Sequence, residues 1–323
     1  MRYPIAYLLA FLAILQPTPI FAWSEAGHLL IALMAYDHLG QKDQQRVVEI
    51  LKHHPRFVED FKAPSKENDP QRWQIGHMGY WADQARKQPK YNRPNWHYEI
   101  GSSVIIGNKS KMRIPKMNAE LPRDANLNTP SLHLTQAIEL CKRVLKSPKS
   151  LPEDKAIALC WIAHLVADAH QPCHAGSLYM EKVFEHESGD RGGNSIQTKQ
   201  KKDLHALWDQ LLGERNSGST KRRMQEIMHD SECQQAAALA VQKHNGLETQ
   251  TWLAESRALA MDHVYTPPVI ASLSVVARGL AEKNEPVDLP IEYLKNAGRI
   301  AQIRAAEGSI RLAKILELCL VDQ

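Results

Sequence analysis

Apolar residues recur with helical spacing along most of this chain. After Trp23, a first helix is predicted to end near Gly40, with one apolar face formed by Leu29, Leu30, Leu33 and Met34. Further helices are predicted over 204–212, 223–244, 250–262 and 290–320. Strand-type alternation is almost absent and no internal repeat is visible, so the pattern predicts an all-α fold, a single-domain helical bundle.

Two helices in the middle of the chain have clear end signals. One follows Pro130. The next is predicted to begin at Ser150, because Ser150 and Glu153 have the spacing of a capping box. It should run to about Ala169, since Pro172 blocks its continuation.

Two stretches are predicted to be irregular. Residues 84–130 are rich in Pro, Asn and Lys, and residues 185–203 contain the run Gly-Asp-Arg-Gly-Gly-Asn. Long ordered loops in compact domains are often functional. We therefore expect functional residues in both stretches.

The first 22 residues have the pattern of a secretory signal peptide. An apolar run covers 5–15, and Ala22 precedes Trp23. This run is shorter than the roughly 20 residues of a membrane span, although an amino-terminal anchor is the alternative. We predict cleavage after residue 22, one domain over 23–323 without a membrane span, and export to the periplasm or the medium.

Charge and cysteine content narrow the function only slightly. The formal net charge is +4, and loss of residues 1–22 removes one basic residue and leaves +3. This balance does not indicate a strongly basic nucleic-acid-binding coat. The five cysteines allow at most two disulfides in an oxidising compartment, in a pairing that the sequence does not define.

The densest candidate chemistry is a repeated His-x-x-x-Asp pattern. His164 and Asp168 have this spacing on one predicted helix, and His205 and Asp209 repeat it on another. Residues four apart project from the same face of a helix. One such pair is usually a surface contact, but two pairs with His174 after the helix break favour metal binding.

Zinc suits such ligands, and multi-zinc sites activate water without a protein nucleophile. Competing signatures are absent: the sequence contains no phosphate-binding Walker loop, no GxSxG elbow and no CxxC pair. The sequence therefore predicts metal-assisted hydrolysis.

Six motifs in order resemble those of the S1/P1 nuclease family. They are WSEAGH at 23–28, WAD at 81–83, WHY at 96–98, HLVADAHQPCH at 164–174, GDRGGN at 189–194 and LHALWD at 204–209. Members of this family are zinc-dependent nucleases and 3'-nucleotidases that prefer single strands, with a fold related to zinc phospholipase C. The resemblance implies the same fold, activity and substrate for this chain.

The resemblance also implies three zinc ions per chain. The first would be bound by Asp83, His97, His164 and Asp168. The second would take the free amine and carbonyl of Trp23, with His28 and a bridging Asp168. The third would take His174, His205 and Asp209.

The amino-terminal ligand has a physical rationale of its own. Signal cleavage creates an α-amine whose pKa, about 7.7, leaves a lone pair near neutral pH. Trp23 would therefore become a ligand only after processing.

Further roles follow from the resemblance. Asp83 would orient the attacking water, and Arg86 would stabilise charge on the phosphate, as electrostatic catalysis requires. Cleavage would leave 5'-phosphorylated products. Tyr98 would stack a base, with Asn194 lining the same pocket, which suits single-stranded nucleic acid.

Some alternatives stay open. The acidic residue expected to bind the base edge falls at Ile100, beside Glu99. His170 could orient a ligand or be structural. The protein could also be a phospholipase C-like phosphodiesterase or a non-catalytic exported zinc-binding protein, although storage needs neither Asp83 nor Arg86.

Overall fold

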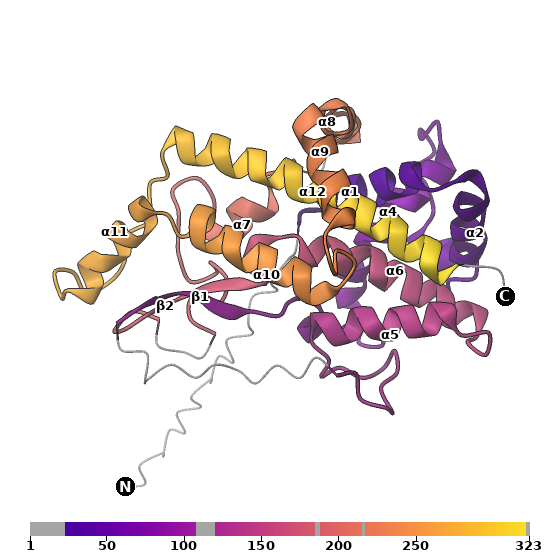
Figure 1. Ribbon diagram of the computed structural model, residues 1–323, viewed down its shortest axis with the longest axis horizontal. Helices are drawn as coiled ribbons and strands as arrows, with labels where there is room; N and C mark the ends of the chain where they lie inside the picture. Colours follow the sequence, from indigo (N-terminus) through magenta and orange to yellow (C-terminus); the bar gives the residue numbers. More distant parts are fainter. Residues whose placement is uncertain (1–22, 108–119, 185–187, 215–216, 321–323) are drawn as a thin grey trace, which may run out of the picture.

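The structure, a computed structural model, describes residues 23–107, 120–184, 188–214 and 217–320. Helices dominate these residues, which confirms the predicted all-α class (Figure 1). The helices are α1 (Glu25–His38), α2 (Gln41–Lys52), α3 (Phe57–Asp60), α4 (Pro70–Gln84), α5 (Leu134–Lys146), α6 (Pro152–Ala169), α7 (Leu204–Asp209), α8 (Ser217–His229), α9 (Ser231–Gln242), α10 (Thr249–Leu259), α11 (Pro267–Ala277) and α12 (Ile291–Cys319). Shorter turns are η1 (Ala85–Lys87), η2 (Pro94–His97), η4 (Pro172–His174) and the π-helical η5 (Ala260–Val264).

Helix α6 lies at the centre of the largest core cluster. It packs against α4 and α5, with α12 and α1 also in contact (Figure 1). Every residue from Ala158 to Ala169 is buried. A helix that is apolar on all sides is stable only inside the protein, so His164 and Asp168 are carried into the interior.

The start of α6 differs from the prediction. Leu151 is the N-cap, and its side chain makes no capping hydrogen bond, so the capping box expected at Ser150 and Glu153 is wrong. Pro152 takes the first helical position instead. Its ring fixes φ and it has no N–H to satisfy, so the helix starts without a side-chain cap.

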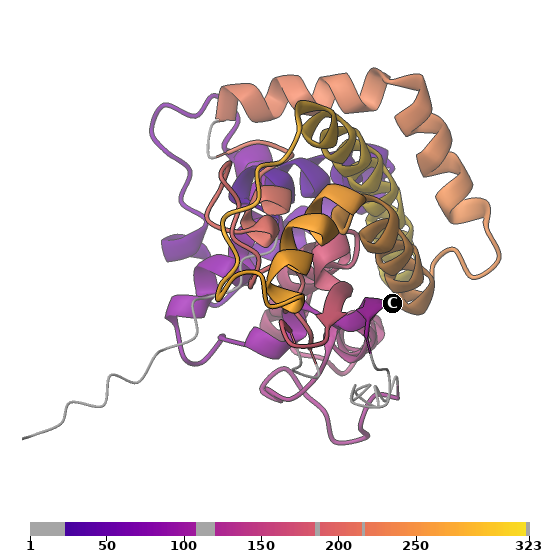
Figure 2. The same ribbon diagram turned by 90° about the vertical axis from the view of Figure 1, so that its left-hand side faces the viewer.

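The segment expected as one helix over 223–244 is two helices. Figure 2 shows α8 and α9 meeting at an angle, and the break lies at Asp230. The Asp230 side chain accepts a hydrogen bond from the backbone N–H of Cys233 and caps α9. A capping residue inside a periodic pattern starts a new helix there.

A two-stranded parallel sheet was not predicted, and its first strand lies in the stretch 84–130 that was expected to be irregular. Strand β1 (Gly101–Ile106) pairs with β2 (Gly176–Met180), with Gly101 opposite Gly176. Just before the strands, the N–H of Glu99 donates to the carbonyl of His174 at 3.0 Å. The pairing therefore brings the segment of His97 beside that of His174, although Gly101 and Gly176 are 75 positions apart in the sequence.

Other expectations have mixed outcomes. All five cysteines are buried free thiols in the structure. No helix within the described ranges is long and apolar enough to cross a membrane. Residues 1–22 lie outside the described part of the chain, so the signal peptide and export stay predictions.

Candidate metal centre

Four predicted ligands converge at the end of α6. The atom His164 Nε2 lies 3.0 Å from His97 Nδ1, and Asp168 Oδ2 lies 3.3 and 3.1 Å from these two nitrogens. Asp83 Oδ1 is 3.9 Å from each nitrogen. All four residues are buried, and they come from α4, η2 and α6.

These separations fit a tetrahedral metal ion. Zinc bonds of 2.0–2.1 Å to nitrogen and oxygen give a ligand-to-ligand distance of about 3.3 Å. The measured distances of 3.0 to 3.9 Å bracket this value. The four side chains can therefore share one zinc-sized cation.

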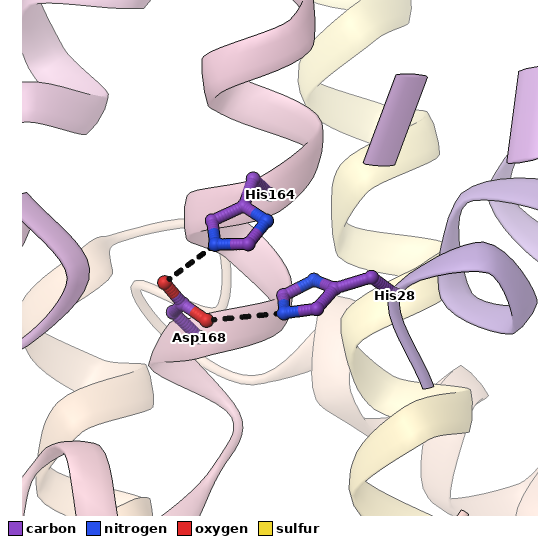
Figure 3. A group of neighbouring side chains, drawn as sticks. All are labelled: His28, His164 and Asp168. Atoms are coloured by element: carbon purple, nitrogen blue, oxygen red, sulfur yellow. Dashed lines mark ion pairs between the residues drawn. The ribbon is translucent and has the colours of Figure 1, made fainter. Parts of the chain in front are cut away.

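A second group joins His28, from α1, to the same pair on α6 (Figure 3). His28 Nε2 lies 3.5 Å from Asp168 Oδ1, and the His28 ring stacks on His164 with centroids 3.9 Å apart. Asp168 thus turns Oδ2 toward His97 and His164 and Oδ1 toward His28. This arrangement allows one carboxylate to bridge two cations.

Trp23 lies against this second group. Its indole is buried, and Nε1 donates to the carbonyl of Ala167 at 3.0 Å. The next residue, Ser24, donates its backbone N–H to the carbonyl of Asp209 at 2.8 Å. The start of the predicted mature chain is therefore fixed between α6 and α7.

The third predicted group is also assembled. His174, His205 and Asp209 offer ligand atoms within 4.8 Å of one another. His205 Nε2 lies 3.6 Å from Asp209 Oδ2, and the two imidazole rings are 5.0 Å apart. The structure thus brings together every ligand side chain that the resemblance implied, in the three predicted groups.

Backbone carbonyls orient three of these imidazoles. The Nδ1 atoms donate to carbonyls as follows: His164 to Gly79 at 2.8 Å, His174 to His97 at 2.6 Å and His205 to Gly192 at 2.7 Å. A carbonyl can only accept, so Nδ1 carries the proton and Nε2 keeps its lone pair. Metal-binding histidines are usually held in this way.

Several polar atoms at the centre have no hydrogen-bond partner among the described residues. They are Oδ2 of Asp83, Oδ1 of Asp168, Nε2 of His97, Nε2 of His174 and both ring nitrogens of His28. An unsatisfied buried polar atom costs about 1–3 kcal/mol. A bound cation would offset this cost for the atoms that face it, which excludes Nε2 of His97 because that ring presents Nδ1 to Asp168 and His164. The remaining donors fit a metal.

Burial changes the acidity of these groups. It raises the pKa of Asp168 to about 6 and raises that of Asp209 further above its usual value. Burial also lowers the pKa values of His28, His97 and His174 well below 6.5. His164 is the exception: burial opposes its charge, but Asp168 and Asp83 raise its pKa. A divalent cation would stabilise the carboxylates and the neutral imidazoles instead.

Arg86 contacts Asp83, one of the four candidate ligands of the first metal ion. Its Nε donates to Asp83 Oδ1 at 2.7 Å, from the short turn η1 that follows α4. Arg86 therefore lies beside Asp83, and its predicted action on a phosphate stays a prediction.

The base-pocket residues are less closely defined. Tyr98 is partly exposed, and its hydroxyl contacts Asn95 Oδ1 at 3.4 Å. Asn194 is partly buried and donates from Nδ2 to the carbonyl of Arg191 at 2.8 Å. Stacking on Tyr98 and a role for Asn194 stay predictions.

Glu99 has a structural partner. Its side chain is buried, and Oε2 accepts the backbone N–H of Thr135 at the start of α5. Glu99 therefore does not replace the acidic residue expected at Ile100.

His170 belongs to the packing of α12 against α6. Its Nδ1 donates to the carbonyl of Val166 at 2.7 Å, and Nε2 lies 2.9 Å from an Arg311 nitrogen. Of the two roles considered, these contacts favour the structural one.

Two supporting residues were not predicted from the sequence. Gln171 donates from Nε2 to Asp209 Oδ1 at 2.7 Å, which leaves Oδ2 facing His205. Asp190 accepts the N–H of Gly193 at 2.9 Å and the hydroxyl of Tyr265 at 3.0 Å. Both lie inside recognised motifs, but no spacing rule connects them with their partners.

Gly192 shows why the loop at 188–196 is rich in glycine. Its φ is +64°, and an added Cβ would come within 2.0 Å of the carbonyl oxygen of Cys173. Only glycine fits that position. Because Gly192 also supplies the carbonyl that orients His205, the loop supports the third group.

Comparisons with known proteins agree with this site. The sequence matches the family described as S1/P1 Nuclease over residues 23–321. It is 27% identical to Endonuclease 4 of Arabidopsis thaliana over 163 residues, 49% of this chain and 49% of that protein. It is 23% identical to Endonuclease 2 of the same plant over 306 residues, 92% of this chain and 90% of that protein.

The chain thus spans about half the length of the first of these relatives and nearly all of the second. The family match covers all six motifs and all three groups of ligands. The resemblance seen in the sequence is confirmed: this chain belongs to the S1/P1 family of hydrolytic, metal-dependent nucleases.

Proposed function

We propose that the protein is an exported, zinc-dependent endonuclease that hydrolyses phosphodiester bonds of single-stranded RNA and DNA to 5'-phosphorylated products, with 3'-nucleotidase activity on small substrates. The observation that carries this proposal is the convergence of buried, unpartnered lone pairs around Asp168 with Arg86 beside them. Endonuclease appears in the names of both plant relatives.

Three zinc ions would be held by the three groups. Asp83, His97, His164 and Asp168 would bind the first. Trp23, His28 and Asp168 would bind the second. His174, His205 and Asp209 would bind the third.

Bound zinc would supply Lewis acidity and lower the pKa of water toward about 7. The protein's own groups would orient the reactants. Asp83 Oδ2 has no hydrogen-bond partner among the described residues, so it can accept a proton from an attacking water. Arg86 donates to Asp83 Oδ1, and its positive charge would stabilise the negative charge that develops on a phosphate bound beside Asp83.

Processing after residue 22 would complete the second zinc site. Two observations support this part of the proposal: the family match starts at Trp23, and Ser24 is hydrogen-bonded to Asp209. The Trp23 indole is already held by the carbonyl of Ala167, the residue before Asp168, so a free amine at Trp23 would be available to the second zinc ion. Export would therefore precede activity.

Base recognition would use Tyr98 and Asn194. Tyr98 directly follows the ligand His97 and is partly exposed, so a base stacked on it would bring its phosphate to the metals. Duplex bases are already stacked on each other. Single strands should therefore be cut faster than duplexes.

A substrate panel with metal analysis tests the function. The protein purified without residues 1–22 should contain three zinc ions and degrade single-stranded RNA and DNA faster than duplex. Release of phosphocholine from a phospholipid, with polynucleotides left intact, would favour a phospholipase. Full zinc content without turnover of any phosphodiester would favour a zinc-binding protein.

The role of the amino terminus needs a separate experiment. A form with two extra residues before Trp23 should hold one zinc ion less tightly than the processed form, and its activity should fall with that zinc. A matched extension at the carboxyl terminus should change neither. Equal zinc content in the two amino-terminal forms would refute the amine as a ligand.

A further inference from the structure

A cleft of about 670 Å³ opens beside Asp83, along α4. Trp73, His77, Tyr80 and Gln84 line it with Asp83 itself, and these positions are three or four apart on one helix face. Its volume lies in the range of small-molecule sites. The cleft therefore adjoins the metal centre at Asp83.

The floor of the cleft has a flat aromatic surface. The rings of Trp73 and His77 stack with centroids 3.5 Å apart and planes at 19°. His77 Nδ1 donates to the carbonyl of Trp73 at 3.1 Å, which fixes the imidazole in this position. Both residues are partly exposed and line the cleft, so a ligand bound there would contact this pair.

The charges in the cleft favour a base over a phosphate. Glu25 lies 3.8 Å from His77 Nε2, and Glu59 and Glu214 also line the cleft. Carboxylates repel a phosphate but accept hydrogen bonds from exocyclic amino groups of bases. Lys62 and Lys87 add positive charge to the same lining, suited to a phosphate at its edge.

The cleft is separate from the pocket predicted around Tyr98. Neither Tyr98 nor Asn194 lines it, and its lining comes from α1, α3, α4, the end of α7 and the turns beside them. A strand with its phosphate at the metal centre has one nucleoside on each side of that phosphate. Two separate base sites therefore suit a phosphodiester.

We propose that the α4 cleft binds the base of one nucleotide next to the scissile phosphate, by stacking on Trp73 and His77, while the base on the other side of the phosphate stacks on Tyr98. This inference rests on the proposed nuclease function. The enzyme would then bind the two nucleosides on either side of the scissile phosphate, as an endonuclease substrate requires.

The test couples each aromatic residue to one base of a small substrate. The substrates are a dinucleoside monophosphate and two analogues, each with one of its bases replaced by hydrogen. Trp73→Leu should lower kcat/KM on the intact substrate on the order of tenfold, mainly through KM. It should cause no further loss on the analogue that lacks the base bound by the cleft.

Matched variants sharpen the result. Trp73→Phe should restore most of kcat/KM because it keeps a flat ring. Gln71→Ala, on an exposed position of the same helix outside the cleft, should leave all three substrates unchanged. Tyr98→Leu should also lower kcat/KM on the intact substrate, but it should cause no further loss on the other analogue, which lacks the base that stacks on Tyr98.

Three results would overturn the inference. Trp73→Leu could lower kcat/KM equally on all three substrates, which would indicate a structural role for Trp73. It could leave kcat/KM unchanged on all three substrates. It could also lose its effect on the same analogue as Tyr98→Leu, which would place both aromatic residues at one base. A wild-type protein that cleaved none of the substrates would instead overturn the proposed function, and this inference with it.

Discussion

Two buried polar regions meet at the end of α6, and they are built in opposite ways. The metal centre gathers aspartates and histidines whose lone pairs converge. The arginine network, formed by His170, Glu255, Arg304, Glu307 and Arg311, lies between α6, α10 and α12. Both regions adjoin the bend that connects Asp168 to His174.

The arginine network supplies its own cations. Glu255 Oε2 accepts from Arg304 at 2.9 Å and from Arg311 at 2.7 Å. Burial alone would raise the pKa of Glu255, but the two arginines hold it well below the usual value. Arg304 also donates from Nε to the carbonyl of His170 at 3.3 Å, so the network holds the bend in place.

The metal centre has no comparable balance. Burial lowers the pKa values of His28, His97 and His174, and these neutral imidazoles cannot neutralise a carboxylate. Burial opposes protonation of His164 too, but Asp168 and Asp83 raise its pKa, so a single imidazole faces two carboxylates. The comparison teaches that a buried polar cluster is structural when its charges are matched within the protein. A cluster whose lone pairs converge without matching charge is built for a cation.

The largest expected effect is at the metal centre. Asp83→Asn should lower kcat on single-stranded DNA more than about 10³-fold, because it weakens both metal binding and water orientation. Steady-state kinetics with zinc analysis of the purified variant provide the measurement. Asp288→Asn, at an exposed position, should match wild type, and full activity of Asp83→Asn would argue against the proposed site.

Next in size is a change in the arginine network. Glu255→Gln should reduce the free energy of unfolding by about 3–5 kcal/mol, because it leaves the buried Arg311 without its carboxylate and leaves Arg304 with Glu307 alone. Zinc content of the folded variant should stay at the wild-type value. Denaturant titration measures the loss, and Glu292→Gln, in an exposed pair, should cost about 0–1 kcal/mol. A variant as stable as wild type would contradict the matched-charge interpretation.

A buried histidine remote from the metal ligands gives a pH-dependent effect. Burial lowers the pKa of His54 from 6.5 to about 4. Between these pH values the unfolded chain binds a proton at His54 that the folded chain does not. The contribution of His54 to stability is therefore present above pH 6.5 and is lost as the pH falls to 4, by roughly 3 kcal/mol.

His54→Asn should remove this part of the pH dependence, because asparagine does not titrate. Unfolding free energies at pH 7.5 and pH 4.5, with excess zinc, give the difference between variant and wild type. His53→Asn, at the exposed neighbouring position, should keep the wild-type slope. An unchanged slope in His54→Asn would show that His54 is not the group responsible.

The smallest expected effect is on zinc affinity at the group formed by His174, His205 and Asp209. Gln171→Ala removes the donor to Asp209 Oδ1 and should weaken zinc binding there about 10- to 100-fold, as loss of a supporting hydrogen bond does. Competition with a chelator measures the affinity. Gln200→Ala, which loses a contact with the exposed Asp288, should bind zinc like wild type. Equal affinities for Gln171→Ala and wild type would remove Gln171 from the site.

The sequence by itself determined the helical class and the identity of the candidate ligands. Apolar spacing predicts helices because one face must be buried, and this local rule placed α1, α5, α6 and α12 within a few residues of their observed bounds. The His-x-x-x-Asp spacing is likewise local, since residues four apart share a helix face. Ordered motifs then linked Asp83, His97 and His28 to these pairs by resemblance.

Only the tertiary structure decided how those residues meet. The β1–β2 pairing sets His97 against His174, and Ser24 is held by Asp209, yet each contact joins segments far apart in sequence. Gln171, Asp190 and the α4 cleft also depend on such contacts. Local spacing fixes which side chains share a face, but folding alone decides which faces enclose a common space.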